Sequence, residues 1–170
     1  MEINELHGKT PSKSFTSDLK DNNETLRINI YELENYWYFL TQGLKENYKF
    51  EYILKLKKDS YLDEEAELEG IAKELQSIAS NTFNIGITYS NYDYLYINDN
   101  YRIGTKEKSN LIGFITIPEN NLSNEIEFIK LVGITKEELK SIQNKKLTIE
   151  ELYKKINNDI TDYNRKSTIN

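Results

Sequence analysis

The sequence contains no cysteine. It therefore cannot form a disulfide framework, a cysteine-based zinc site or a thiol nucleophile. Histidine is almost as scarce, because His7 is the only one and stands in a polar N-terminal stretch. A Ser-His-Asp triad or a histidine-based zinc site would have to be built on this one residue. We interpret His7 as a solvated residue of the N-terminal tail.

Long apolar runs and an excess of basic charge are also missing. Residues 1–21 are polar and hold no segment typical of a signal peptide. No apolar run approaches the roughly 20 residues that a membrane span needs, so we expect a soluble, cytoplasmic protein that binds no membrane. Lys and Arg number 22 against 28 Asp and Glu, a net charge of −6. This balance argues against direct nucleic-acid binding, which needs clustered basic residues, and is compatible with a basic protein partner.

Sequence motifs of common enzymes are absent. The seven glycines are scattered and form neither G-x-G-x-x-G nor a P-loop, and no G-x-S-x-G elbow is present. Asp93 and Asp99 stand six residues apart, but without the pattern of a calcium loop. The abundance of carboxylates leaves a two-carboxylate hydrolase open on inventory alone. With no further motif to support it, we expect no enzyme, no cofactor and no bound metal.

Apolar residues make up 38% of the chain and aromatic residues 12%, enough for the core of one domain. Residues 1–24 have few large apolar side chains, so we predict a flexible N-terminal arm and a folded domain over 25–170. Residues 26–31 alternate between apolar and polar, which is typical of a half-buried strand. The stretches 36–41 and 50–58 predict two more strands, and the short links between the three favour an antiparallel meander.

The apolar period then changes from two to between three and four. It predicts an amphipathic helix of about 17 residues that begins after Asp63, a suitable N-cap. Further strands are expected over 94–97, 111–117 and 126–132, with Pro118 as a break after the second.

Two short helices are predicted near the C-terminus, each from a capping box. Thr135 is followed three residues later by Glu138, and Thr148 by Glu151. The chain is expected to end in a small hairpin. Together these elements predict a single α+β domain, with one long helix and two short C-terminal helices packed on a mixed, mostly antiparallel β-sheet.

Acidic residues are concentrated where the long helix is expected to begin. Residues 59–75 hold seven acids and one base. The plain interpretation is a solvated helix face. The functional one is a docking surface for a basic protein, because complementary charge speeds association. The candidate residues of this surface are Asp63, Glu64, Glu65 and Glu67.

Tyrosine is dense in the irregular stretch that follows the helix. The two interpretations, packing along a poorly covered sheet edge and partner recognition, are equally open. Tyrosine is favoured at interfaces because it is large, rigid and able to form a hydrogen bond at one end. The candidate residues here are Tyr89, Tyr92, Asp93, Tyr94 and Tyr96.

The C-terminal third reads IEFIKLVGITKEELKSI and then LTIEELYKKINNDITDYNRKSTI. It resembles the Suppressor of fused-like family, in which a hydrophobic-Val-Gly-hydrophobic-Thr step, an acidic helix start and an I-T-D-hydrophobic-x-R element follow in this order. Ile160, Thr161, Asp162 and Arg165 match the last element. Upstream, YWYFLTQGL, KFEYILKLKK and LEGIAKELQSIASNTFNIG are similar to further family segments, so the resemblance spans residues 26–169.

The chain departs from the eukaryotic pattern in two ways. Gly86 is followed by Ile87 and Thr88, where eukaryotic members often have Asp and His, and no second C-terminal domain follows in this sequence. The eukaryotic role, in which a transcription-factor tail is held between two domains, therefore does not carry over.

Small stand-alone bacterial members of the family are regarded as immunity proteins of polymorphic toxin systems. The resemblance therefore implies a non-enzymatic bacterial protein that binds and neutralises a cognate toxin domain, which we expect to be a basic nuclease. A regulatory module that captures an extended peptide by strand addition is the alternative. The sequence leaves the oligomeric state open.

Overall fold

A computed structural model describes residues 6, 8–19, 24–97, 109–119 and 126–169. His7 and Asp99 lie outside these residues. The elements of the described chain are β1 (Lys13–Leu19), β2 (Glu24–Glu32), β3 (Tyr36–Gln42), α2 (Lys45–Tyr48), β4 (Phe50–Lys57), α3 (Glu64–Ile85), β5 (Tyr94–Tyr96), β6 (Leu111–Glu119), β7 (Glu127–Thr135), α4 (Lys136–Gln143), α5 (Ile149–Ile156) and β8 (Ile160–Thr161).

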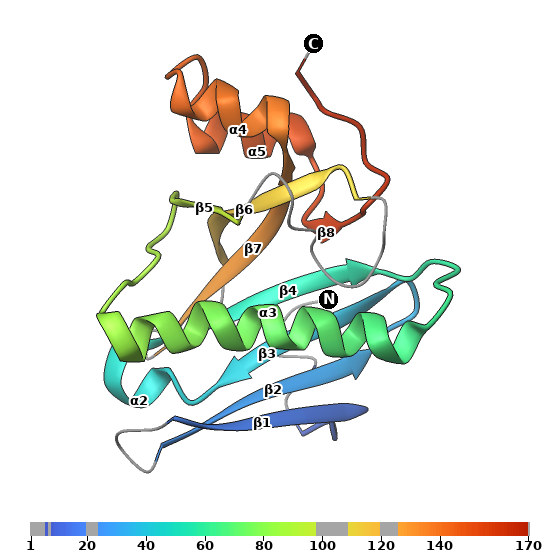
Figure 1. Cartoon of the computed structure of the whole chain (residues 1–170), viewed down its shortest axis with the longest axis vertical. Coiled ribbons are helices and arrows are strands. Elements are labelled where there is room, and N and C mark those ends of the chain that lie inside the picture. Colours follow the sequence, from blue (N-terminus) through green and yellow to red (C-terminus); the bar gives the residue numbers. More distant parts are fainter. Residues whose placement is uncertain (1–5, 7, 20–23, 98–108, 120–125, 170) are drawn as a thin grey trace.

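All the strands join one sheet, in the order β1-β2-β3-β4-β7-β6-β5, with β8 paired to β4 beside this path. The β4–β7 and β4–β8 pairs are parallel and the others are antiparallel. The prediction of a single α+β domain with a mixed, mostly antiparallel sheet is confirmed. β4 pairs with β7 as far as Leu54 and with β8 from Lys55 onward, so the sheet forks there (Figure 1).

Helix α3 lies across one face of β1–β4 (Figure 1). Its apolar side chains, including Leu68 and Leu75, pack with alternate strand residues such as Phe39 and Leu54. The predicted N-cap is confirmed, since Asp63 accepts a hydrogen bond from the backbone of Ala66 at 3.0 Å. The helix has 22 residues and no helix in the described chain is apolar enough over its length to cross a membrane.

Helix α3 is longer than predicted. The sequence pattern ends too early because the residues near the C-terminal end of the helix are weak helix formers. Ser80, Asn81 and Thr82 have modest helix propensity, so the sequence pattern fades there. The helix nevertheless continues because Ala79 and Thr82 are fully buried. It ends at Gly86, which adopts the left-handed conformation that glycine tolerates, with φ of 67°.

Helices α4 and α5 cover β6 and β7 with a second apolar cluster. Val132 and Ile134 of β7 pack with Leu139 and Leu152 of the two helices, whereas Leu131 belongs to the cluster under α3. Because neighbouring residues of a strand point to opposite faces, α3 and the α4–α5 pair lie on opposite sides of the sheet. Both predicted capping boxes are confirmed.

Pro118 does not end its strand, contrary to the prediction. Strand β6 continues to Glu119, and Pro118 lies opposite Ile129 of β7. Two residues earlier, Thr116 donates its backbone N–H to Asp93, on the β5 side of the strand. By alternation, the nitrogen of Pro118 faces the same side beyond the end of β5, where the ladder needs no donor.

The N-terminal and C-terminal segments also differ from expectation. Lys13–Leu19 falls within the predicted flexible arm of residues 1–24 but forms β1, antiparallel to β2. Leu6 is buried against Tyr38 and Ile53, on the sheet face opposite α3. The segment KSFTSDL has only two apolar residues, too few to show a strand period. At the other end, β8 pairs with β4, and the described residues after it form turns and no second hairpin strand.

Candidate partner-binding surfaces

The acidic helix start presents three of its four predicted residues to solvent. Asp63, Glu64 and Glu65 are exposed where α3 begins. Glu65 forms an ion pair of 2.9 Å with Lys13 of β1, which ties this end of the helix to the sheet edge. Leu62, immediately before the helix, is fully exposed. The surface therefore combines carboxylates with one apolar side chain.

Glu67, the fourth predicted residue, cannot take part in a docking surface because only 2% of it is exposed. It lies near Tyr163, whose pKa is raised by burial and by Glu67. The reason is the helical period, since Glu67 lies on the same face as Ile71 and Ile78. Counting acidic residues along the sequence hid this, although the apolar stripe of the same helix could have shown it.

Tyr92, Tyr94 and Tyr96 form a surface that we call the tyrosine strip. Their exposed fractions are 46%, 36% and 49%. In β5 the neighbouring Leu95 points into the core, so Tyr94 and Tyr96 share the outer side of the strand. Tyr89 differs from them because it is half-buried and packs against the core cluster under α3.

The buried residue Thr116 of β6 holds the loop that leads into the tyrosine strip. Its hydroxyl accepts a hydrogen bond from the Asp93 backbone N–H at 2.7 Å and donates one to the Ser90 carbonyl at 2.5 Å. Its backbone carbonyl accepts from the Tyr92 N–H at 2.8 Å, and its N–H donates to Asp93 at 2.9 Å. Asp93 itself uses its carboxylate to cap the Tyr94 N–H at 2.8 Å.

The acidic helix start lies where α3 begins, whereas the tyrosine strip lies on and before β5, which the chain reaches after leaving the other end of the helix (Figure 1). The two predicted groups belong to different elements, the start of α3 and β5, so we treat them as two separate candidate surfaces.

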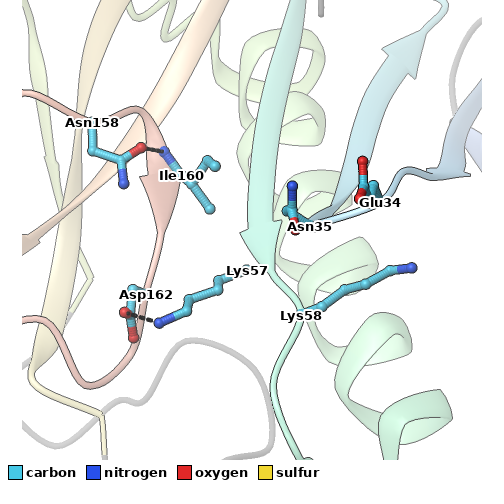
Figure 2. Close-up of a pocket in the computed structure, with 7 residues that line it drawn as sticks. All are labelled: Glu34, Asn35, Lys57, Lys58, Asn158, Ile160 and Asp162. Atoms are coloured by element: carbon cyan, nitrogen blue, oxygen red, sulfur yellow. Dashed lines mark hydrogen bonds and ion pairs between the residues drawn. The ribbon is translucent and has the colours of Figure 1, made fainter.

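Sequence reasoning missed an open groove at the fork of the sheet (Figure 2). It has a volume of about 290 Å³ and is lined by Glu34, Asn35, Lys57, Lys58, Asn158, Ile160 and Asp162. These residues come from three distant segments, which explains why no sequence pattern indicated the groove. The I-T-D element nevertheless supplied Ile160 and Asp162.

The two lysines of this groove are both paired with carboxylates, one of them inside the groove and one beside it. Lys57 donates to Asp162 at 2.8 Å, and Figure 2 shows the two side chains pointing at each other. Burial tends to raise the pKa of Asp162, but Lys57 and the Asn164 backbone N–H outweigh it and lower the pKa. Lys58 pairs with Glu32 at 2.8 Å. The groove is thus nearly neutral and offers little attraction to a charged ligand.

A half-buried ion-pair network fixes the loop between α5 and β8. Asp159 accepts from Lys55 of β4 at 2.7 Å and from Lys130 of β7 at 3.3 Å, and Lys130 also pairs with Glu119 at 3.1 Å. Burial alone would raise the pKa of Asp159, but the two lysines lower it. This network ties the wall of the groove to the central strands.

Two buried carboxylates have structural roles rather than the geometry of an acid–base pair. Glu51 accepts from the Thr41 hydroxyl at 2.6 Å and from the backbone amides of residues 43–45, so it fixes the turn between β3 and α2. Burial raises the pKa of Glu51 despite these bonds. Glu138 is bound to Arg165 at 2.7 Å and has a lowered pKa. In the described part of the chain, no three His, Asp or Glu side chains are grouped to hold a metal.

Comparison with solved structures shows which proteins share this fold. A Sufu protein, crystallised in complex with Fu, matches with a TM-score of 0.71 and 15% identity over 98% of this chain and 88% of that one. A Suppressor of fused homologue from Neisseria gonorrhoeae matches with a TM-score of 0.68 and 15% identity over 98% and 92%. No curated protein matches the sequence. The Suppressor of fused protein family model matches residues 21–166, and the chain therefore belongs to the Suppressor of fused family.

Proposed function

We propose that this chain is an immunity protein that binds and neutralises a cognate toxin domain, in the cytoplasm and without a cofactor. The family and fold are those of a protein–protein interaction module, and the Sufu structure is a complex with a protein partner. The net charge of −6 makes a basic toxin, such as a nuclease, the better electrostatic match.

The observation that carries this proposal is the ordered tyrosine strip on the surface. The cores of protein interfaces are rich in tyrosine and poor in charge. Residues 85–97 contain no Lys or Arg and a single acid, Asp93. Ile85 and Ile87, which lead from α3 toward the strip, are exposed as well. This segment has the composition of an interface centre, whereas the acidic helix start has that of a polar rim.

The test is binding to the protein encoded by the neighbouring reading frame, prepared in a catalytically inactive form. We expect the two chains to co-purify as a stable complex, and co-expression of this chain to protect cells from the active toxin. Absence of a complex, or toxicity that persists on co-expression, would rule out the proposal.

Peptide capture by strand addition remains the second candidate because β1 is an outer strand of seven residues, paired only with β2. At the other sheet edge the same mode is disfavoured, since the Asp93 carboxylate already occupies the Tyr94 N–H. Such a module would bind short unfolded peptides, whereas a toxin inhibitor requires a folded partner. Binding measured with the folded toxin domain and with its heat-unfolded fragments separates the two.

A further inference from the structure

Thr116 supports the tyrosine strip from inside the fold. It cannot contact a partner itself, because its side chain is fully buried. Its hydroxyl joins two points of the preceding loop, the Asp93 N–H and the Ser90 carbonyl. A valine of nearly the same shape would fill the same space but could make neither bond. The hydroxyl therefore has a defined role, which is to hold residues 90–93 in position.

The loop needs this support because its backbone is not in a relaxed conformation. Tyr92 has φ of 60°, in the left-handed region that bulky residues rarely adopt. Two hydrogen bonds flank it directly, one from its own N–H to the Thr116 carbonyl and one from the Asp93 N–H to the Thr116 hydroxyl. A loop held in this way loses less conformational entropy when a partner binds.

The charges around the strip indicate what the partner presents. The strip has three aromatic rings, one acid and no base in the surrounding residues 85–97. It also follows the C-terminal end of α3, whose last turn has no basic residue to offset the negative end of the helix dipole. Tyrosine ring faces attract Arg and Lys side chains. A basic surface therefore complements the strip in charge and can place cations against its rings.

From these observations we infer that Thr116 is a positioning residue that holds the tyrosine strip ready to receive Arg or Lys side chains of a folded basic protein. The inference rests on the proposed toxin-binding function and adds to it the chemistry that the strip recognises. It also assigns the centre of the interface to the tyrosine strip, with the acidic helix start outside it.

The first experiment compares Thr116→Val, which removes the hydroxyl, with Thr116→Ser, which keeps it. The probe is the catalytically inactive protein of the neighbouring reading frame, with affinity and rates measured by surface plasmon resonance. We expect Thr116→Val to bind about tenfold or more weakly and Thr116→Ser within about threefold of the unaltered chain. Equal binding by a folded Thr116→Val chain overturns the positioning role.

Hydrogen exchange of the unaltered chain tests the same role without any variant. The Asp93 amide is expected to exchange slowly, because its N–H is bonded to a buried hydroxyl. If this amide exchanges at the rate of an unstructured peptide, the strip is not held in advance and the inference fails, whether or not Thr116→Val folds.

The second experiment asks what the rings recognise. Tyr94→Phe keeps the aromatic ring face. Tyr94→Leu keeps an apolar side chain but has no ring face. We expect Phe to bind within about threefold of the unaltered chain and Leu about tenfold more weakly. Equal binding by the two variants overturns the recognition of cations by the rings. If the unaltered chain forms no complex, the proposed function and this inference fall together; if it does and the variants bind equally well, only the inference fails.

Discussion

At the scale of single residues, a few buried polar side chains hold long stretches of this chain together. Glu138 completes the capping box of α4 by accepting from the Thr135 N–H at 2.9 Å. It also accepts from both terminal nitrogens of Arg165 at 2.7 Å and from the Thr168 backbone at 2.9 Å. Arg165 in turn donates to the Gly133 carbonyl at 2.8 Å. The residues that mark the family in the sequence are thus partly those that fasten the C-terminal segment to the fold.

This arrangement predicts a pH dependence of stability. Burial would raise the pKa of Glu138, but Arg165 and the amides of Thr135 and Thr168 outweigh it and lower the pKa. A carboxyl whose folded pKa is lowered stabilises the protein above its unfolded value of about 4.3 and loses that contribution as pH falls through the folded value. We therefore expect the free energy of unfolding, measured by urea titration, to decrease as pH falls below about 5.

The matched variants for this measurement are Glu138→Gln and Glu151→Gln, since both residues close a capping box. Glu151 is fully exposed, whereas Glu138 is buried beside Arg165. Glu138→Gln removes the only carboxylate that the half-buried Arg165 contacts among the described residues, so we expect a loss of about 3 kcal/mol or more at pH 7 and a flatter pH profile. If the free energy of unfolding fell with pH as steeply in Glu138→Gln as in Glu151→Gln, Glu138 would not be the source of the pH dependence.

At the scale of elements, the N-terminal segment is part of the fold. Leu6 is buried against Tyr38 and Ile53, and β1 is paired along its whole length with β2. We expect Leu6→Ala to reduce the free energy of unfolding by about 2 kcal/mol or more, as for other buried leucines. The matched control is Leu62→Ala at a fully exposed position, for which we expect a change within about 0.5 kcal/mol. Equal effects of the two would show that the segment is an arm after all.

Secondary structure was predictable wherever one face of an element packs on the core. The period of two in β2 and the period near 3.6 in α3 both arise in this way, and the capping boxes at Thr135 and Thr148 are local enough to read directly. β1 could not be predicted because it is an edge strand whose pairing with β2, not its own apolar content, orders it. The continuation of β6 through Pro118 depends on where β5 ends, which is a fact of tertiary structure.

At the scale of the whole molecule, composition indicated the kind of surface but not its layout. The sequence named the tyrosines and acids separately, and the fold places them on different elements, β5 and the start of α3. It turns Glu67 inward and half-buries Tyr89, while Tyr92, Tyr94 and Tyr96 remain exposed. Thr116 gave no signal because its role depends on the pairing of β5 with β6, which the sequence does not display.

This layout predicts that the acidic helix start and the tyrosine strip affect different rates of binding. The acidic helix start, outside the interface centre, acts through long-range charge and should change the association rate. We expect the double variant Glu64→Gln and Glu65→Gln to associate several-fold more slowly with the inactive neighbouring-frame protein at low salt. Its dissociation rate should be unchanged, because neither carboxylate is part of the tyrosine strip.

Salt provides the decisive control for this assignment. At about 0.5 M salt, charges more than roughly 5 Å apart are screened, so the double variant and the unaltered chain should associate at the same rate. Tyr94→Leu should retain its faster dissociation at every salt concentration, because a ring–cation contact buried in the interface is screened much less than exposed, separated charges. A double variant that dissociates faster at high salt would place Glu64 and Glu65 inside the contact and shift the interface to the start of α3.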